Sequence, residues 1–426
     1  MIEADTYRVT TLGCRVNRAD SLAIERQLAG AGYRRAAPGE TPSVWVVNTC
    51  AVTGEGMRKS RKAVRRSAAS GARVFVTGCG VDFDPEAFDV EGVESLMDNA
   101  GKPGIARSMT PLRGGVPAES WAPEDLTRVP VKVQEGCERR CSYCVVPHLR
   151  PDPYSRSMRD VLSEVRLLKG SGVGEVILCG IDLGGYRDPE TGADLVALAQ
   201  RVLEDAAPSW VRLSSIELSD VTDGLVGLIG EEQGLCPHLH LPLQSGDGGV
   251  LRDMARSYTP EWFLERISVL RERAPGISIT TDVMVGFPTE GDEEFENTAR
   301  VLEAMSVSRV HVFRYSPRRG TAAHPMGDPV DPAVKRARAL AVRGIAARSA
   351  QRFQEGLVGR IIPVLVEGEM PGEPGNLFAR TRWFTGMVIP KGRQRTGEIL
   401  EGVAGAVEGG LLRGEAVVQP RRREVD

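Results

Sequence analysis

The chain has 426 residues, and its ordinary hydrophobic (41%) and charged (26%) fractions exclude a disordered protein and predict two or three domains. No apolar run approaches the ~20 residues of a membrane span, and no signal peptide is evident. Eight cysteines are too few for a secreted disulfide scaffold. We therefore expect a cytoplasmic protein without a membrane partner. The net charge of −3 excludes a uniformly basic nucleic-acid binder, although it allows local basic patches.

Residues 1–107 alternate short β-branched runs with helical patterns. Strands are expected over 7–13, 43–49 and 72–78, and helices over 19–31 and 55–69. This alternation predicts an α/β domain with a doubly wound parallel sheet. Residues 108–128 are rich in Pro, Gly, Glu and Ser and are expected to form a linker.

Residues 129–355 repeat a strand-then-helix unit about six times and end in a basic helix over 333–354. The six expected strands carry the sequences VKVQEG, EVILCGI, WVRLSSIE, HLHLPLQS, SITTDVMVGF and SRVHVFRYS. Six units are fewer than the eight of a closed barrel, so we expect a partial (β/α)6 barrel. Residues 356–426 contain short strands with Gly-rich turns and predict a small C-terminal β-barrel.

Three cysteines, Cys137, Cys141 and Cys144, follow the first strand of the expected partial barrel. Three thiolates at these spacings can hold a soft metal centre that keeps one open position. A zinc site completed by His148 is the alternative that the spacing leaves open. The position at the carboxyl end of a barrel strand favours a reactive centre, because such folds assemble their active sites there.

Three further cysteines, Cys14, Cys50 and Cys79, each come directly after an expected parallel strand. The carboxyl ends of parallel strands meet at one edge of a sheet, which predicts a second three-thiolate metal site. The alternative is that all three are small buried core residues. Core packing is the favoured interpretation for Cys179 and Cys236.

Taken together, the cysteine spacing, the incomplete barrel, the N-terminal cysteines and the terminal β-barrel resemble the radical S-adenosylmethionine (SAM) methylthiotransferases. In that family the terminal barrel is an RNA-binding TRAM domain. The segments TLGCRVNRADS, VVNTCAVTGEGMRKSRKAVRR and RLSSIELSDVTD are most similar to the branch that acts on threonylcarbamoyladenosine in tRNA. The branches that act on isopentenyladenosine in tRNA or on a ribosomal-protein aspartate are alternatives, as is a non-catalytic RNA-binding protein with structural zinc.

The resemblance implies two 4Fe–4S clusters. One, held by Cys137, Cys141 and Cys144, would bind and cleave SAM to give a radical, and the other, held by Cys14, Cys50 and Cys79, would carry the sulfur to be transferred. The product would be a methylthio group at C2 of N6-threonylcarbamoyladenosine at position 37 of tRNA. Besides tRNA, the implied partners are an electron donor such as flavodoxin or ferredoxin and a sulfur source.

Polar residues and glycines at successive strand ends of the central domain are candidate SAM contacts. They could alternatively cap the helices that follow. The candidates are Gly180, Ser214, Ser215, Glu217, Gln244, Asp282 and Gly286.

Two groups of basic residues are candidate RNA contacts, since phosphate binding requires local positive charge. The first is Arg58, Lys59, Arg61, Lys62, Arg65 and Arg66, and the second is Arg380 and Arg382 beside Trp383 and Phe384. Two positions depart from the usual pattern of the family. Pro151 stands where a glycine is usual, and Thr381-Arg382-Trp383-Phe384 stands where Thr-x-Asn-Tyr is usual.

Overall fold

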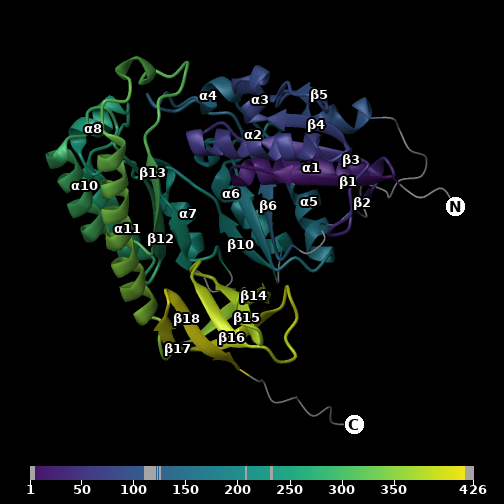
Figure 1. Cartoon of the computed structure of the whole chain (residues 1–426). Helices are drawn as coiled ribbons and strands as arrows, with labels where there is room; N and C mark the ends of the chain where they lie inside the picture. Colours follow the sequence, from purple (N-terminus) through teal and green to yellow (C-terminus); the bar gives the residue numbers. More distant parts are fainter. Residues whose placement is uncertain are drawn as a thin grey trace, which may run out of the picture.

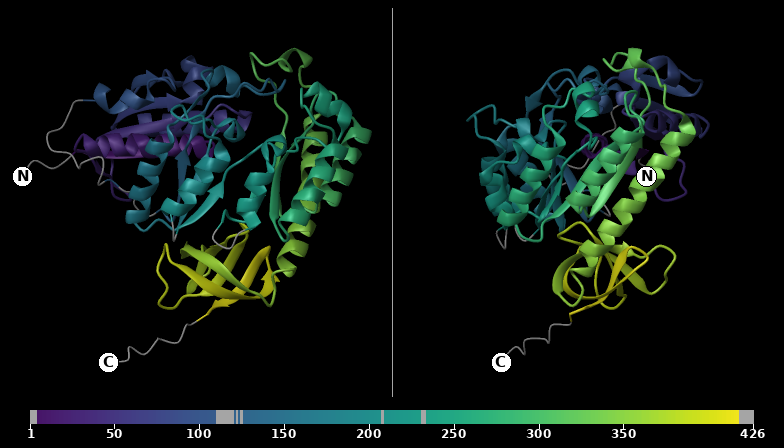
Figure 2. Two further views of the ribbon diagram at one scale, coloured as in Figure 1. Left: turned by 180° about the vertical axis from the view of Figure 1, so that it is seen from behind. Right: turned by 90° about the vertical axis from the view of Figure 1, so that its left-hand side faces the viewer.

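The computed structural model describes residues 5–109, 121, 123, 126–206, 209–230 and 234–417, which form three domains in chain order (Figure 1). Most of the expected linker over 108–128 lies outside these residues. The N-terminal domain packs against the central partial barrel, and the C-terminal barrel lies at the opposite end of the central strands (Figures 1 and 2).

The N-terminal domain is the expected doubly wound parallel sheet, with strand order β2-β1-β3-β4-β5. Helix α1 starts at Arg15, about one turn before the expected residue 19, because Val16 is the one apolar residue of its first turn and gives no helical repeat by itself. The elements are β1 (Thr6–Thr11), α1 (Arg15–Gly30), β2 (Arg34–Arg35), β3 (Val44–Thr49), α2 (Gly54–Ala68), β4 (Arg73–Gly78), α3 (Cys79–Phe83), η1 (Pro85–Phe88), β5 (Val93–Met97) and η2 (Lys102–Ser108).

The central domain contains all six expected strands and confirms the partial barrel. Two three-stranded parallel sheets, β10-β9-β6 and β11-β12-β13, are joined by a parallel bridge between Ser215 and His240. The strands are β6 (Arg128–Lys132), β9 (Glu175–Cys179), β10 (Trp210–Leu213), β11 (His238–His240), β12 (Ser278–Val285) and β13 (Arg309–Arg314). Around them lie β7 (Gln134–Glu135), α4 (Val146–Leu149), β8 (Tyr154–Ser155), α5 (Met158–Gly170), η3 (Leu183–Gly185), α6 (Leu195–Ala206), η4 (Leu218–Asp220), α7 (Asp223–Gly230), α8 (Gly248–Asp253), α9 (Pro260–Arg273), α10 (Asp292–Met305), η5 (His324–Met326) and α11 (Pro332–Glu355).

The C-terminal domain is a closed five-stranded barrel, as expected, reached through the long helix α11 (Figure 1). Its turn over residues 382–385 projects to the amino-terminal ends of the central strands, where the ring of Phe384 stacks on His238 with 4.7 Å between ring centres. The strands are β14 (Ile361–Glu369), β15 (Asn376–Thr381), β16 (Gly386–Pro390), β17 (Ile399–Glu408) and β18 (Leu411–Ala416).

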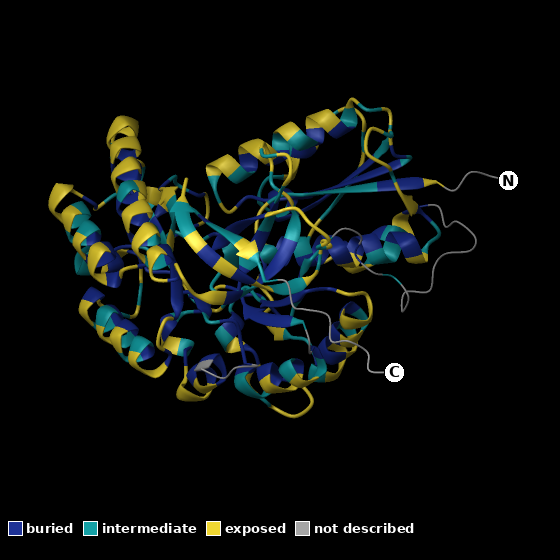
Figure 3. Cartoon of the chain, turned by 90° about the horizontal axis from the view of Figure 1, so that it is seen from below, coloured by how far each residue is buried: buried dark blue, intermediate teal, exposed yellow. Residues whose placement is uncertain are grey.

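Outer helices expose one face and bury the other against strands (Figure 3). Helix α2 illustrates the pattern, because its buried residues Met57, Ser60, Val64 and Ser67 recur every three or four positions and leave the basic residues outside. Within the described part of the chain, no helix combines the length and apolar character that a membrane crossing would need.

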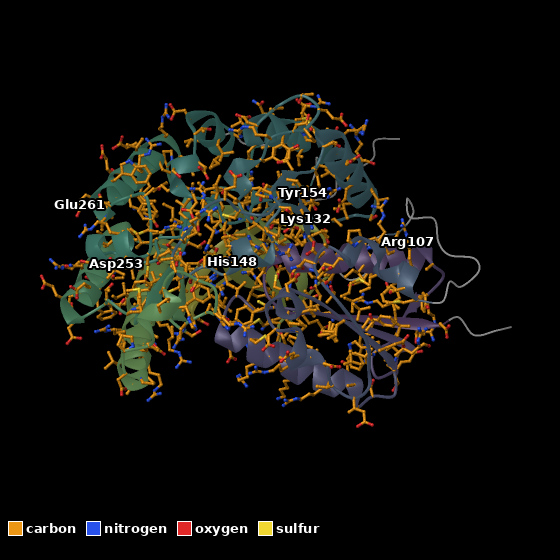
Figure 4. All side chains as sticks on the ribbon, turned by 90° about the horizontal axis from the view of Figure 1, so that it is seen from above. Arg107, Lys132, His148, Tyr154, Asp253 and Glu261 are labelled. Atoms are coloured by element: carbon orange, nitrogen blue, oxygen red, sulfur yellow. The ribbon has the colours of Figure 1, made fainter. Side chains whose placement is uncertain are left out.

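A buried ionic network joins the N-terminal and central domains. Asp20 on α1 accepts hydrogen bonds from Lys102 (2.8 Å), Lys132 (2.5 Å) and Arg150 (2.9 Å). Glu135 accepts from Lys132 (2.8 Å) and Arg150 (2.6 Å). Lys132 lies where the first domain meets the second (Figure 4). Burial opposes the charged form of Asp20, yet the three cations hold the pKa of its carboxyl well below the usual range.

Replacing Asp20 with Asn tests this junction. Loss of the carboxylate leaves three cations facing one another in a desolvated site, so we expect the free energy of unfolding to fall by about 3–5 kcal/mol at neutral pH. The control is Glu204→Gln, which removes an exposed ion pair with Arg201 and should cost less than about 1 kcal/mol. Equal losses for the two variants, measured by denaturant unfolding, would contradict the assignment.

Candidate active site

Backbone geometry brings the N-terminal cysteines together at the carboxyl ends of β1, β3 and β4. Gly13 and Gly78, each directly before a cysteine, have φ of +97° and +98°. A Cβ on Gly13 would lie 2.8 Å from the Sγ of Cys50, and one on Gly78 would lie 2.4 Å from Asn48. Only glycine fits these positions, which lets the chain turn from each strand into a helix beside the other cysteines.

The three sulfurs are neighbours. Burial raises the pKa of the Cys50 thiol to about 11, and the nearby Cys79 and Cys14 add to the shift by charge repulsion. Cys14 is exposed whereas Cys50 and Cys79 are buried, so the group opens to solvent on the side of α1. Thiols with a raised pKa are poor ligands until a metal displaces their protons, and a multinuclear metal centre can do so.

Two side chains donate to the sulfur of Cys79. The Nδ2 of Asn99 lies 3.6 Å from it, and the Nε of Arg150 lies 3.5 Å from it. Arg150 also donates to Asn17 (2.8 Å), whose Nδ2 in turn holds the carbonyl oxygens of Leu12 and Thr49 (2.8 Å each), just before Cys14 and Cys50. The same polar network therefore supports all three cysteines.

The second group, Cys137, Cys141 and Cys144, lies on a loop that is anchored at Ser142. Ser142 accepts a hydrogen bond from the backbone N–H of Ala323 (2.7 Å) and donates to Asp253 (2.6 Å). The backbone N–H of Arg139 donates to the sulfur of Cys137 (3.4 Å). Burial raises the pKa of the Cys137 thiol to about 11 and that of Cys144 to about 12.

Arg256 connects this loop to the end of strand β10. Its Nη1 donates to the sulfur of Cys141 (3.2 Å), and its Nη2 pairs with Glu217. Glu217 is one of the predicted SAM contacts, so the structure brings that residue beside the cysteine loop. A cation at this position stabilises negative charge on a thiolate or on a bound carboxylate.

One compact group of possible metal ligands lies apart from the cysteines. Two thiolates on one tetrahedral zinc, at ~2.3 Å each, lie about 3.8 Å apart. Within the described residues, the one group of three His, Cys, Asp or Glu ligand atoms that all lie within 4.8 Å of one another is His240, Asp282 and His311. Neither cysteine group meets this criterion.

The two cysteine groups are joined through α4. Val145 and Leu149 pack into the hydrophobic core that contains Val47 and Cys79 of the N-terminal domain. Only five residues separate Cys144 from Arg150, which contacts Cys79. The segment that carries the second group therefore also forms one wall of the first.

The other predicted SAM contacts occupy different surroundings. The Oδ1 of Asp282 lies 3.1 Å from the Nε2 of His240 and 3.4 Å from the Nδ1 of His311, and although burial opposes the shift, these two imidazoles lower the pKa of Asp282 to about 2. Gln244 adopts a φ of +66°, and its backbone N–H bonds to the carbonyl oxygen of Asp282 (2.9 Å).

The remaining candidates are dispersed. Ser214 is buried and Ser215 is exposed at the end of β10. A Cβ on Gly180 would meet the side chain of Gln134 at 2.9 Å, and one on Gly286 would meet Lys335 of α11 at 2.4 Å. A SAM contact by each of these residues stays a prediction.

The two predicted RNA-binding groups differ in exposure. On α2, Arg61 is half-buried and Arg58, Lys59, Lys62, Arg65 and Arg66 are exposed. Arg380 instead bonds to Glu367 (3.1 Å), and Arg382 donates to the carbonyl oxygen of Gly234 (2.8 Å) in the central domain. The second group thus has partners within the chain, and its RNA contact stays a prediction.

Sequence patterns alone do not identify several residues around the cysteines. Asn99 and Arg256 lie 20 or more positions along the chain from the thiols that they contact. Arg139 contacts the sulfur of Cys137 through its backbone N–H. No motif marks them as partners of a metal site. Their only sequence signal is polarity just after a strand or near a loop, which many surface residues share.

Comparison with known proteins identifies the family. The Radical SAM superfamily matches residues 131–302, and the Uncharacterized protein family UPF0004 matches residues 6–96. The chain is 32% identical to Threonylcarbamoyladenosine tRNA methylthiotransferase MtaB of Bacillus subtilis, over 85% of each protein. It is 34% identical to the MtaB protein of Chlamydia pneumoniae, over 85% of this chain and 87% of that one. The chain belongs to the radical SAM methylthiotransferases.

Other methylthiotransferases are nearly as similar. The tRNA-2-methylthio-N(6)-dimethylallyladenosine synthase of Moorella thermoacetica is 31% identical over 97% of this chain and 98% of that protein. Among solved structures, the radical SAM methyltransferase TsrM from Kitasatospora setae, with cobalamin and a [4Fe-4S] cluster bound, aligns with a TM-score of 0.53 at 14% identity, over 75% of this chain and 77% of that one. At this identity the likeness concerns the fold. Membership of the radical SAM superfamily assigns an iron–sulfur cluster and SAM to the methylthiotransferase.

Proposed function

We propose that this methylthiotransferase transfers a methylthio group to C2 of N6-threonylcarbamoyladenosine at position 37 of tRNA. The observation that carries the proposal is the placement of two three-cysteine groups on either side of α4, one after the sheet strands of the N-terminal domain and one after β6. One centre generates a radical and the other supplies sulfur in a reaction of this kind. The similarity to three proteins named for threonylcarbamoyladenosine supports the choice of substrate.

The cofactors proposed are two 4Fe–4S clusters and SAM. Cys137, Cys141 and Cys144 would hold the cluster that cleaves SAM, and Cys14, Cys50 and Cys79 would hold the second one. When bound, these groups supply the radical and the sulfur. The protein donates hydrogen bonds to Cys141 and Cys79, and the core around Val145 and Leu149 excludes water. An electron donor such as flavodoxin or ferredoxin and a sulfur source are the proposed partners besides tRNA.

Iron content tests the cofactor assignment. After anaerobic reconstitution, we expect about eight irons per chain in the wild type. Replacing all three cysteines of either group with Ala should leave about four. The variant that lacks Cys14, Cys50 and Cys79 should still cleave SAM, whereas the variant that lacks the other three should not. Replacing Cys179 and Cys236, which are buried in apolar cores, is the matched control and should leave the iron content unchanged.

The same measurement tests the rival from another class, a non-catalytic RNA-binding protein with structural zinc. Two zinc ions per chain without iron would support that rival and reject the enzyme.

Nucleoside analysis tests the substrate. Deleting the gene should remove 2-methylthio-N6-threonylcarbamoyladenosine from tRNA and leave its unmethylthiolated precursor, measured by mass spectrometry of digested tRNA. Selective loss of the 2-methylthio isopentenyl product would instead assign the enzyme to the branch of the Moorella relative. An unchanged set of tRNA nucleosides would point to the branch that acts on a ribosomal protein.

The exposed face of α2 is the proposed docking surface for the phosphates of tRNA. Replacing Arg58, Lys59, Arg61 and Lys62 with Ala should weaken tRNA binding and reduce the slope of log Kd against log salt, by roughly 0.7–0.9 for each phosphate that the variant no longer binds. The helix should still form, because its buried residues and its Thr53 N-cap are retained.

The control for this variant removes four positive charges from exposed positions on α5 and α6. These are Arg159, Arg166, Lys169 and Arg201. The proposal fails if this control reduces the slope as much as the α2 variant does, because the effect would then reflect total charge.

A further inference from the structure

Four arginines surround one aromatic ring inside the partial barrel. The ring of Phe384, from the C-terminal domain, lies 5.1–5.5 Å from the guanidinium groups of Arg15, Arg128, Arg212 and Arg380. These arginines come from α1, β6, β10 and β15, so all three domains contribute to this arginine cage.

The cage carries more positive than negative charge. Glu175 accepts from Arg128 (2.8 Å) and Arg212 (2.8 Å). Glu367 accepts from Arg128 (3.2 Å) and Arg380 (3.1 Å). Four guanidinium groups thus face two carboxylates. Within the described residues, Arg15 is the member of the cage with neither a hydrogen bond nor an ion pair from its guanidinium.

The helix position of Arg15 does not favour a cation. Arg15 is the first residue of α1, and the amino-terminal end of a helix disfavours positive charge. Its nearest charged neighbours in the cage include two further arginines, Arg128 and Arg212. Arg15 keeps some exposed surface, whereas Arg212 and Glu175 are fully buried. An anion that reaches Arg15 from the accessible side would balance this charge.

The position of Arg15 indicates which anion arrives there. Arg15 directly follows Cys14, and its side chain extends from there to the ring of Phe384, so a substituent that extends toward this ring from an adenine at the N-terminal cysteines would reach the guanidinium. C2 and C6 flank N1 on the six-membered ring of adenine, and C6 carries the exocyclic N6, so a substituent on N6 begins close to the reacting carbon. A threonylcarbamoyl group ends in a carboxylate, and a dimethylallyl group is a hydrocarbon.

We propose that Arg15 binds the carboxylate of the N6-threonylcarbamoyl group at the open side of the arginine cage and so selects this substrate over an adenosine with an apolar N6 substituent. The inference rests on the proposed function and deepens it. A guanidinium pairs with a carboxylate through two parallel hydrogen bonds, and leaving a buried guanidinium unpaired rejects a substrate that lacks the anion.

Binding measurements with reconstituted full-length enzyme test the proposal. Three anticodon stem-loop RNAs differ only at position 37: N6-threonylcarbamoyladenosine, its methyl ester and N6-dimethylallyladenosine. For the wild type, we expect the acid to bind at least about tenfold more tightly than the ester. Arg15→Gln should abolish this ratio through loss of affinity for the acid alone, and Arg15→Lys should retain part of it. Arg18→Gln, which removes a cation one turn further along α1, should retain it fully.

Several results would overturn the inference. Equal loss of affinity for acid and ester in Arg15→Gln would indicate a general RNA contact. Loss of SAM binding with an unchanged ratio of affinities would indicate that Arg15 binds the carboxylate of SAM. Loss of iron would indicate that Arg15 supports the cluster at Cys14. A wild type that methylthiolates the acid without discriminating it from the ester would refute this inference and keep the proposed function, whereas a wild type that modifies only the dimethylallyl RNA would refute both.

Discussion

Arg150 follows Cys144 by six positions, yet its guanidinium contacts Asn17, Asp20 and the sulfur of Cys79 in another domain. A buried guanidinium is tolerated only when nearly all of its donors have partners, because the cost of removing it from water is large. Satisfying Arg150 therefore requires α1, β7 and the loop after β6 to meet in one arrangement. That arrangement brings the two cysteine groups to the same junction.

The C-terminal barrel constrains the opposite end of the central strands in a similar way. The turn over 382–385 replaces the family's usual Asn-Tyr with Trp-Phe, and the ring of Phe384 is held between His238 and the arginine cage. Arg212 is fully buried there, paired with Glu175 and bonded to the carbonyl oxygen of Arg382 (2.9 Å). The cysteine groups and the arginine cage are consequently built from all three domains, so the site depends on their docking.

Much of the fold and part of the site could be predicted from sequence. Alternating β-branched runs and helical patterns identified the parallel sheet, the six central strands and the terminal barrel, because local hydrophobic periodicity reflects which face of an element is buried. The positions of three cysteines just after strands predicted the N-terminal thiolate group, since parallel strands end at one edge, and the spacing of the other three predicted the second group. The first turn of α1 was missed because Val16 is its one apolar residue.

The amino-acid sequence by itself determined the domain order, the strand-end positions of six cysteines and the family. Only the tertiary structure decided that Arg256 donates a hydrogen bond to the sulfur of Cys141 and Arg150 one to the sulfur of Cys79. It also decided that Arg380 and Arg382 have partners inside the chain. The physical reason is the separation along the chain over which each kind of interaction acts. Periodicity and capping act over a few residues, whereas a buried charge is paired by whichever side chains the packed domains bring within hydrogen-bond distance, at any separation along the chain.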